Sequence, residues 1–451
     1  MFGVLKRVIG IGSLVIGLSG PAWADADKTD PFVTSIDAAL RKNPRATAAA
    51  AQLRAALERL PQSQAALLPT IDLNASKGHS RLDWRDGAAS TDPDVVGLSL
   101  TQVLFNQKAL VAMRQTKPYI ASFERDAQAA VQGVFLEASS VIVEVLQATE
   151  VVRLAKNNRE VLKQHLEATR SRFRVGEITR TDVSWAESRL ASAEANLVRS
   201  ENTLALARTR FVEVVGMPVP EGLHLPGFRE KLEALSQVEM RLRSAERPDL
   251  VAATLRLKVS EEDVALKRAG HMPSVALSAR ASRTWGEETS GTVDPLNKYS
   301  VDLGVTLPLY AGGMIVSQTA EAEARKDAQA ADLERMRLQV EREVESALLD
   351  LKSAQAANQA LESGLKAANN ALDGVEREYR VGTRTALDLL DARNEAFSAQ
   401  TELAKGRFAL VLAGFKLLYA TGGLNLDALL PAVNAVQPVA PLKEQLKESR
   451  P

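Results

Sequence analysis

Apolar and polar residues alternate in four short runs along the chain. Ile71 and Leu73 are flanked by polar neighbours, and the same period of two recurs over 96–101, 275–282 and 299–307. Such alternation gives a β-strand one apolar and one polar face. It is typical of strands in a transmembrane barrel, and it also fits an antiparallel sheet packed on helices.

Long polar loops at 80–94 and 286–298 join these runs in pairs, as external loops join the strands of an outer-membrane barrel. Four strands are too few to close a barrel, which needs about eight. Open sheet edges in hydrocarbon would leave backbone groups unpaired. Several chains must therefore share one barrel if the strands span a membrane. Two chains would leave little room inside, whereas three would supply twelve strands around a water-filled lumen.

Helical periodicity dominates the rest of the chain and predicts the same order of elements twice: an opening helix, two strands, a long helix, and a shorter helix after a Gly-containing break. These elements are expected at about 32–66, 68–105, 107–173 and 180–215, and again at about 246–270, 272–309, 313–380 and 386–421. A helix of about 65 residues is about 100 Å long, which is longer than the diameter of a compact domain. A coiled-coil spacer in a non-channel periplasmic scaffold is the alternative interpretation.

Matching segments in the same order indicate an internal duplication. Asn43-Pro44 corresponds to Arg247-Pro248 at an offset of 204, and 173–176 (FRVG) corresponds to 379–382 (YRVG) at an offset of 206. The chain is therefore expected to contain two structural repeats. The predicted divisions are a signal peptide at 1–24, repeats at 25–216 and 246–423, a linker at 217–245 and a tail at 424–451.

The first residues have the pattern of a secretory signal peptide. Lys6 and Arg7 precede an apolar run at 8–18, and Ala22-Trp23-Ala24 offers small residues for cleavage before Asp25. An uncleaved anchor is the alternative, but the run is short for a membrane span. We find no later apolar stretch of about 18 residues, so membrane contact is expected through the strands.

Composition narrows the function classes further. The 451 residues include 56 basic and 56 acidic side chains, a balance that argues against a nucleic-acid binder. With no Cys, the chain has no disulfide, thiolate nucleophile or lipidated N-terminal cysteine. Its four histidines are scattered, and no phosphate-binding loop or nucleophile motif is present. We therefore expect no metal, no cofactor and no enzymatic activity.

The most specific segment is YRVGTRTALDLLDA over 379–392. With its first-repeat counterpart at 173–183, it resembles the TolC family of outer-membrane channel proteins, also called outer-membrane efflux proteins. The resemblance covers nearly the whole mature chain. It implies a mainly α fold with a membrane β-barrel portion: a homotrimer sharing one 12-stranded barrel, a periplasmic α-helical tunnel, and a collar formed by 217–245 and the tail.

The same resemblance implies a passive exit duct in the outer membrane of a Gram-negative bacterium. Relatives of this kind act in tripartite export systems, so the expected partners are a periplasmic adaptor protein and an inner-membrane transporter. An ABC transporter would deliver unfolded proteins for type I secretion, whereas a proton-driven pump would deliver small toxic compounds for efflux. Outer-membrane lipid is a further expected partner, and nucleic acid is not.

The resemblance places the Gly176 and Gly382 turns at the periplasmic tip, where the tunnel narrows. It implies a gate in which a Tyr and an Arg of the second repeat bond a Thr-Asp pair of the first. The gate positions are Tyr379, Arg384, Thr181 and Asp182.

Two further acids, Asp388 and Asp391, would form carboxylate rings that bind cations at the entrance. A structural role competes with this interpretation, because Thr179-x-x-Asp182 and Thr385-x-x-Asp388 are also capping boxes. Asp391 has no such alternative, since its repeat counterpart is Trp185.

Overall fold

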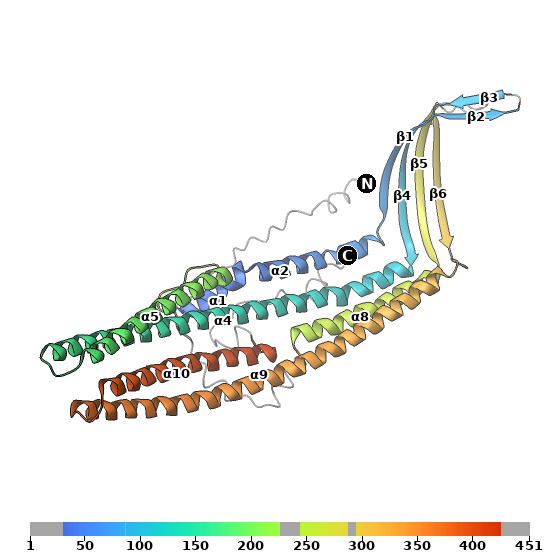
Figure 1. The fold of residues 1–451 in the computed structure, drawn as a ribbon. Helices are drawn as coiled ribbons and strands as arrows, with labels where there is room; N and C mark the ends of the chain where they lie inside the picture. The colour runs from blue at the N-terminus through green and yellow to red at the C-terminus, as the bar shows by residue number, and fades with distance from the viewer. Residues whose placement is uncertain (1–29, 86, 226–243, 287–294, 425–451) are drawn as a thin grey trace.

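The computed structural model describes residues 30–85, 87–225, 244–286 and 295–424. The predicted signal peptide, most of the linker and nearly all of the tail lie outside these residues. The described chain is elongated: a four-stranded sheet stands at one end, and helices extend away from it to two hairpin turns at the other (Figure 1).

The sheet is antiparallel and its strand order is β1-β4-β5-β6. Its strands are β1 (Thr70–Lys77), β4 (Asp94–Asn106), β5 (Ser274–Trp285) and β6 (Leu296–Thr306). Each repeat therefore contributes one pair of strands, and the two pairs meet between β4 and β5. Within the described residues β1 and β6 are edge strands, each with one side left for pairing.

The segment at 80–94 is more regular than the polar loop that we expected. It contains β2 (Ser80–Trp84) and β3 (Gly87–Thr91), which form a separate two-stranded hairpin beyond the end of the sheet (Figure 1). In the sequence, Leu82 and Trp84 alternate with Arg81 and Asp83. This alternating run is short, and the Gly, Ser and Asp residues around it are typical of turns. The sequence pattern therefore predicts a loop here and not a strand.

The strand register aligns the alternating residues into rows across the sheet, because directly paired residues lie on the same face. One apolar row consists of Leu73, Leu98, Ala281 and Tyr299, and its neighbour of Ile71, Leu100, Ala279 and Val301. The opposite face carries the row Asp72, Ser99, Arg280 and Ser300. On the apolar face Leu73 is 72% exposed and Val301 73%. In the described chain nothing covers this apolar face.

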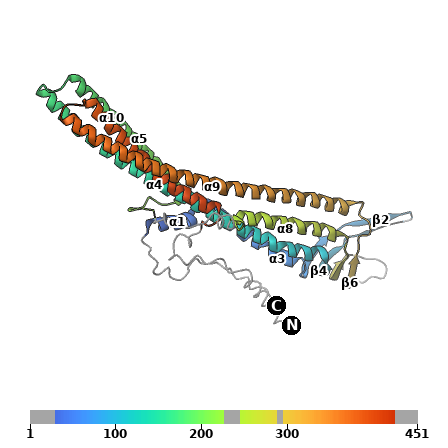
Figure 2. The same cartoon turned by 90° about the horizontal axis from the view of Figure 1, so that it is seen from below.

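Two very long helices, α4 (Gln107–Arg174) and α9 (Met314–Arg380), form the body of the molecule. Near the turns, α5 (Arg180–Val215) folds back on α4 and α10 (Ala386–Ala420) on α9. Near the sheet, α8 (Pro248–Arg268) packs between α4 and α9 and continues into η1 (Ala269–His271), as Figure 2 also shows. Along α4 run α1 (Pro31–Lys42), α2 (Pro44–Leu57) and α3 (Arg59–Ala65).

A hydrophobic core lies where α1, α4, α5 and α10 meet, midway along the molecule. The rings of Phe32 and Phe415 stack there with centroids 6.2 Å apart. By length and composition alone, α4 contains a stretch apolar enough to cross a membrane, and 44% of that stretch is buried. Our expectation that no such stretch follows the signal peptide was therefore wrong. The reason is packing, since α4 contributes Val134, Phe135 and Ile142 to this core.

The two repeats attach their short helices in the same way. Asn43, which caps α2, donates from Nδ2 to the carbonyl of Val214 at 3.3 Å. Its counterpart Arg247 donates from Nη1 to the carbonyl of Ala420, also at 3.3 Å. The residue before the helix-opening Pro therefore binds a terminal carbonyl of the short helix in both halves, where helix carbonyls lack intrahelical partners.

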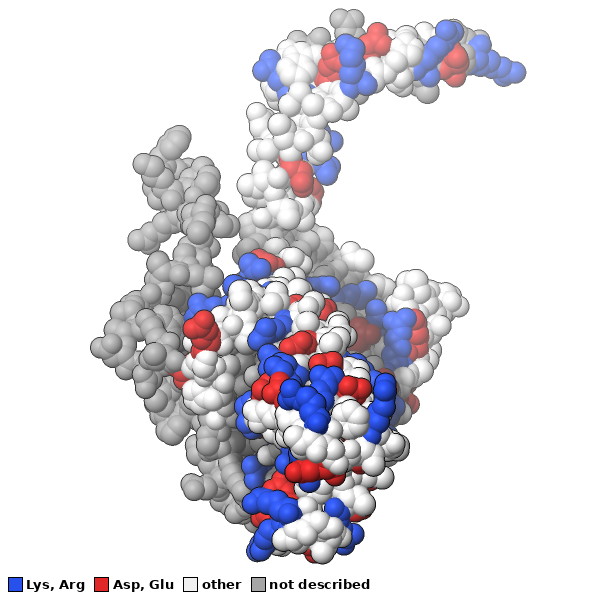
Figure 3. All heavy atoms as spheres, turned by 60° about the vertical axis from the view of Figure 1, so that its left-hand side comes forward, with Lys and Arg blue, Asp and Glu red and all other residues white. Residues whose placement is uncertain are grey.

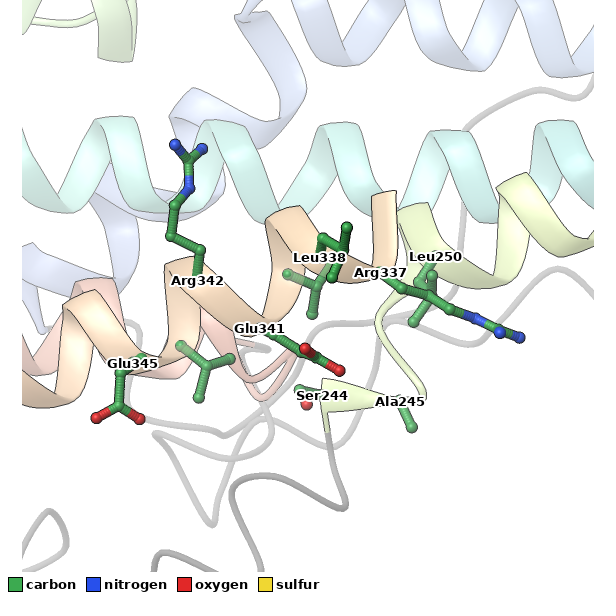
Figure 4. Close-up of a pocket in the computed structure, with 10 residues that line it drawn as sticks. Ser244, Ala245, Leu250, Arg337, Leu338, Glu341, Arg342 and Glu345 are labelled. Atoms are coloured by element: carbon green, nitrogen blue, oxygen red, sulfur yellow. The ribbon is translucent and has the colours of Figure 1, made fainter. Parts of the chain in front are cut away.

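Beside Arg247, α8 and α9 line a cavity of about 730 Å³ (Figure 4). Leu250 of α8 and Leu338 and Glu341 of α9 lie along it, and Arg342 points away. Ser244 and Ala245 line the same cavity at the point where the described chain resumes. The lining residues are mixed, with the apolar Leu250, Leu338 and Val340 beside the charged Arg337 and Glu341.

Candidate functional site

Both helical hairpins end in a turn that requires glycine. Gly176 has φ 78° and Gly382 has φ 83°, in the left-handed region that glycine adopts without strain. Their N–H groups donate to the carbonyls of Phe173 and Tyr379 at 3.0 and 3.1 Å, and the next N–H in each turn reaches the carbonyl five residues back. This is the Schellman arrangement, which ends a helix sharply. The two turns are therefore built alike and lie at the same end of the molecule (Figure 1).

A capping box opens the short helix after each turn. Thr179 Oγ1 accepts from the N–H of Asp182 at 3.3 Å, and the Asp182 carboxylate accepts from the N–H of Thr179 at 2.9 Å. Thr385 and Asp388 repeat this pair at 3.1 and 3.0 Å. The hydrogen bonds from the Thr385 N–H and hydroxyl lower the pKa of Asp388. Both acids thus cap helices, as the competing interpretation expected, and their functional roles stay predictions.

Tyr379 bonds across to the first hairpin, although not to the residues that the resemblance implied. Arg172 donates from Nη1 to Tyr379 Oη at 2.7 Å, and its guanidinium lies 5.4 Å from the centre of the ring. Arg172 also binds the Glu177 carboxylate at 2.9 Å. Within the described chain Tyr379 is therefore held by Arg172, whereas Asp182 is engaged in its cap.

Arg384 stays within its own turn. Its Nε donates to the Glu378 carboxylate at 2.8 Å, and both side chains are half-exposed. Thr181 lies in the first turn of α5 beside Asp182. The geometry of one chain therefore gives Tyr379 and Arg384 partners other than Thr181 and Asp182.

Asp391 forms a second connection between the hairpins. Arg189 on α5 donates from Nη2 to Asp391 Oδ1 on α10 at 2.6 Å. Asp391 is thus paired with a cation inside the chain, on the other hairpin, and it has no part in a helix cap. Its place in a ring of three carboxylates stays a prediction.

Sequence reasoning missed three of these residues: Arg172, Arg189 and Glu378. A signal was present in the repeat alignment, because position 172 corresponds to 378 and position 189 to 395. At both pairs of positions the first repeat has Arg and the second has Glu. The equivalent positions do not bind each other, because Arg172 binds Tyr379 and Glu177 and Arg189 binds Asp391, so the pattern marks these positions as different in the two repeats without giving their partners.

The outer surface at the helical end carries both signs of charge. Figure 3 shows Lys and Arg interspersed with Asp and Glu over the helices that face the viewer, and both signs of charge also occur at the far end of the strand region, at the top of the view. In the described residues no group of three His, Cys, Asp or Glu side chains could hold a metal ion. The site is thus a pair of tips joined by ion pairs and hydrogen bonds.

Comparisons with known proteins agree with this architecture. The outer membrane efflux protein family model matches residues 35–217 and 241–423. The outer membrane protein TolC of Escherichia coli is 26% identical over 97% of this chain and 92% of its own length. The outer membrane efflux protein BepC of Brucella suis is 27% identical over 95% and 93%. The proteases secretion protein PrtF of Dickeya chrysanthemi is 26% identical over 93% of each chain.

Solved structures share the fold. The CmeC outer-membrane channel of Campylobacter jejuni matches with a TM-score of 0.76 at 17% identity, covering 93% of this chain and 89% of its own. The MtrE channel of Neisseria gonorrhoeae, in its open state, matches with a TM-score of 0.72 at 23% identity, covering 88% and 90%. The chain therefore belongs to the outer membrane efflux protein family and is an exit channel of the Gram-negative outer membrane, of the kind that serves efflux and type I secretion.

Proposed function

We propose that three copies of this chain close one shared barrel of twelve strands in the outer membrane and form a passive duct. The observation that carries this proposal is the four-stranded sheet, with its exposed apolar face and its two edge strands. A free edge cannot face hydrocarbon, so β1 of one copy must pair with β6 of the next. The apolar face would then meet lipid and the polar face the lumen.

The helices would extend the duct from the barrel into the periplasm. At 1.5 Å per residue, the 68 residues of α4 span about 100 Å. The duct has no energy source of its own, so an inner-membrane transporter, either an ABC or a proton-driven pump, would deliver cargo through a periplasmic adaptor protein. A scaffold without a channel would have no use for an exposed apolar sheet. We also propose that the chain has no enzymatic activity.

The choice of cargo depends on which pump is the partner. PrtF is named as a proteases secretion protein, and OpmQ of Pseudomonas putida as a pyoverdine export protein. One relative is therefore named for the export of proteins and the other for the export of a compound. Neighbouring genes for an ABC transporter would favour protein export, and genes for a proton-driven pump would favour efflux.

Charged substitutions on the two faces of the sheet test the barrel. Leu98→Arg or Leu277→Arg, on the apolar face, is expected to cost about 2–4 kcal/mol of barrel stability. Ser99→Lys and Ser278→Lys, on the polar face, should assemble like wild type, because a charge in the lumen stays hydrated. Heat-resistant oligomers on gels, from matched amounts of membrane, give the comparison. Equal assembly of the two kinds of variant would contradict a lipid-facing apolar surface.

We further propose that the tips close the duct on the periplasmic side. The contacts Arg172–Tyr379 and Arg189–Asp391 join the two hairpins of one chain, so separating the hairpins would break both. Thr181, Asp182 and Arg384 lie in the same region and would meet neighbouring copies in a trimer. Asp388 and Asp391 would line the entrance as rings of three carboxylates, which attract cations.

A trivalent cation should block the duct from the periplasmic side. Asp391→Ala is expected to remove most of the block while lowering stability by less than about 1 kcal/mol, because its ion pair with Arg189 is partly exposed. Asp388→Ala should weaken the block and also lower the melting temperature, because it removes a helix cap. The part of the block due to Asp388 should be lost only as pH falls through the pKa of this acid, which the hydrogen bonds from Thr385 lower. Single-channel currents at two pH values, with melting curves, measure both effects. Full block in Asp391→Ala would show that this acid does not line the entrance.

A further inference from the structure

The apolar face of the sheet changes character at the end away from the helices (Figure 1). Counted from the helices, the described strands place no charged residue on this face as far as the row that contains Ala281 and Tyr299. Arg283 lies in the next row, and Trp285 lies in the row beyond it. A cation therefore stands on the face that would meet lipid, directly beyond its apolar rows.

The height of Arg283 on the sheet matches the edge of a membrane. A barrel strand rises about 3.4 Å per residue and tilts by about 40°, so Arg283 lies about 21 Å and Trp285 about 26 Å beyond Val275, the first apolar residue of β5. The apolar band of such barrels is about 25 Å tall and is flanked by aromatic residues. Tyr299 and Trp285, 79% and 36% exposed, fit such an aromatic girdle. Arg283 therefore lies at the level of the lipid headgroups.

The guanidinium of Arg283 is available to a ligand. The side chain belongs to an exposed residue, and within the described residues it pairs with no carboxylate. It lies 5.2 Å from the centre of the Trp285 ring, a contact that positions the guanidinium plane without using its N–H donors. The nearby Lys77 and Asp94 bind each other at 3.3 Å. Each copy thus has one cation without a counterion at this edge.

We propose that Arg283 binds a phosphate group on the headgroup of an outer-leaflet lipid, with Trp285 holding the guanidinium in place. A guanidinium donates two parallel hydrogen bonds to a phosphate, which suits this residue better than a neutral headgroup does. A lipid also presents its phosphate at the level of Arg283 while its acyl chains contact the apolar rows, whereas free phosphate stays hydrated. This inference rests on the proposed barrel, in which three copies would offer three such sites.

Lipid A with two phosphate groups is the probe, and the same lipid A without phosphates is its matched partner. Native mass spectrometry of the full-length protein in detergent gives both the mass of the oligomer and the number of bound lipids. We expect the phosphorylated lipid to bind about tenfold more tightly, because a hydrogen bond between charged groups typically contributes such a factor. Equal binding of the two lipids to a trimer would overturn this proposal alone, whereas the absence of a trimer would overturn the shared barrel on which it rests.

Two substitutions on the same strand locate the site. Arg283→Gln removes the cation and keeps a polar side chain, so it should abolish the preference for phosphorylated lipid. Arg280→Gln is the matched control, because Arg280 is also exposed but lies on the polar face. This control should keep the preference, and equal preference in both variants would contradict the proposal. The wild-type comparison of the two lipids stands even if a variant fails to assemble.

Inorganic phosphate distinguishes a lipid site from a site for the free anion. At millimolar concentration it should not displace bound lipid A from the wild-type trimer, because it lacks the acyl chains that contact the apolar rows. Displacement would indicate a site for free phosphate and would overturn the lipid as the occupant.

Discussion

Arg247→Met is expected to lower the free energy of unfolding by about 3–5 kcal/mol, the usual cost of removing one partner from a buried ion pair. Arg247 is only 4% exposed, and it binds Asp249 and Glu343 at 2.5 and 2.7 Å. Burial alone would lower the pKa of Arg247, but the hydrogen bonds to the two carboxylates outweigh it and raise the pKa. Without the arginine, both partly buried carboxylates would face each other without a counterion.

Arg210→Met is the matched control for this prediction. Arg210 also bridges two helices, by binding Glu144 at 3.1 Å, but both side chains are about half exposed. Its loss should therefore cost less than about 1 kcal/mol. Helical circular dichroism during heating measures both variants. Adding Asp249→Asn and Glu343→Gln to Arg247→Met should recover part of the lost stability. Equal shifts in melting temperature for Arg247→Met and Arg210→Met would show that the buried ion pairs of Arg247 contribute no more to stability than an exposed pair.

Tyr379→Phe is expected to open the duct. The bond from Arg172 to Tyr379 joins different hairpins, so it exists only while the hairpins lie together, and its loss favours the open state. A hydrogen bond with a charged donor contributes about 1.5–3 kcal/mol. Even half of that shifts a two-state equilibrium by roughly threefold to tenfold. Single-channel conductance in planar bilayers should rise accordingly.

Arg170→Ala is the control for this prediction, and Arg384→Ser tests whether Arg384 also bonds to a neighbouring copy. Arg170 binds Glu187 within the first hairpin, so its loss should leave conductance unchanged. Arg384 binds Glu378 within one turn of the same chain, a contact that can survive opening. An increase in conductance in Arg384→Ser would therefore indicate an additional bond to a neighbouring copy. Unchanged conductance in a properly assembled Tyr379→Phe variant would show that the Arg172–Tyr379 hydrogen bond does not hold the duct closed.

Features set by local periodicity could be predicted from the sequence. The alternation around Leu73, Leu98 and Val301 predicted strands whose apolar residues do fall into rows. The helix expected at about 107–173 spans Gln107–Arg174, because its apolar spacing continues without a break until Gly176. The capping boxes at Thr179 and Thr385 are equally local, since each involves residues three positions apart.

Features set by distant contacts could not be predicted in the same way. Which residue meets Tyr379 depends on how α4 and α9 are aligned, and a shift of one helical turn would replace Arg172 by another side chain. The same holds for Arg189 and Asp391. Arg247 looked like an ordinary charged residue before a proline, because its burial becomes evident only once α8, α9 and α10 are packed together.

Disulfide cross-linking between β1 and β6 tests the shared barrel most directly. The chain has no Cys, so introduced pairs are unambiguous. One cysteine replaces Asp72 or Asn74 on β1, and a second replaces Lys298 or Ser300 on β6. The four combinations test different alignments of β1 of one copy with β6 of the next. For at least one pair, we predict a covalent ladder that ends at three chains on non-reducing gels. Monomers alone for every pair, or a ladder that ends at two or continues beyond three, would contradict a barrel built from three copies.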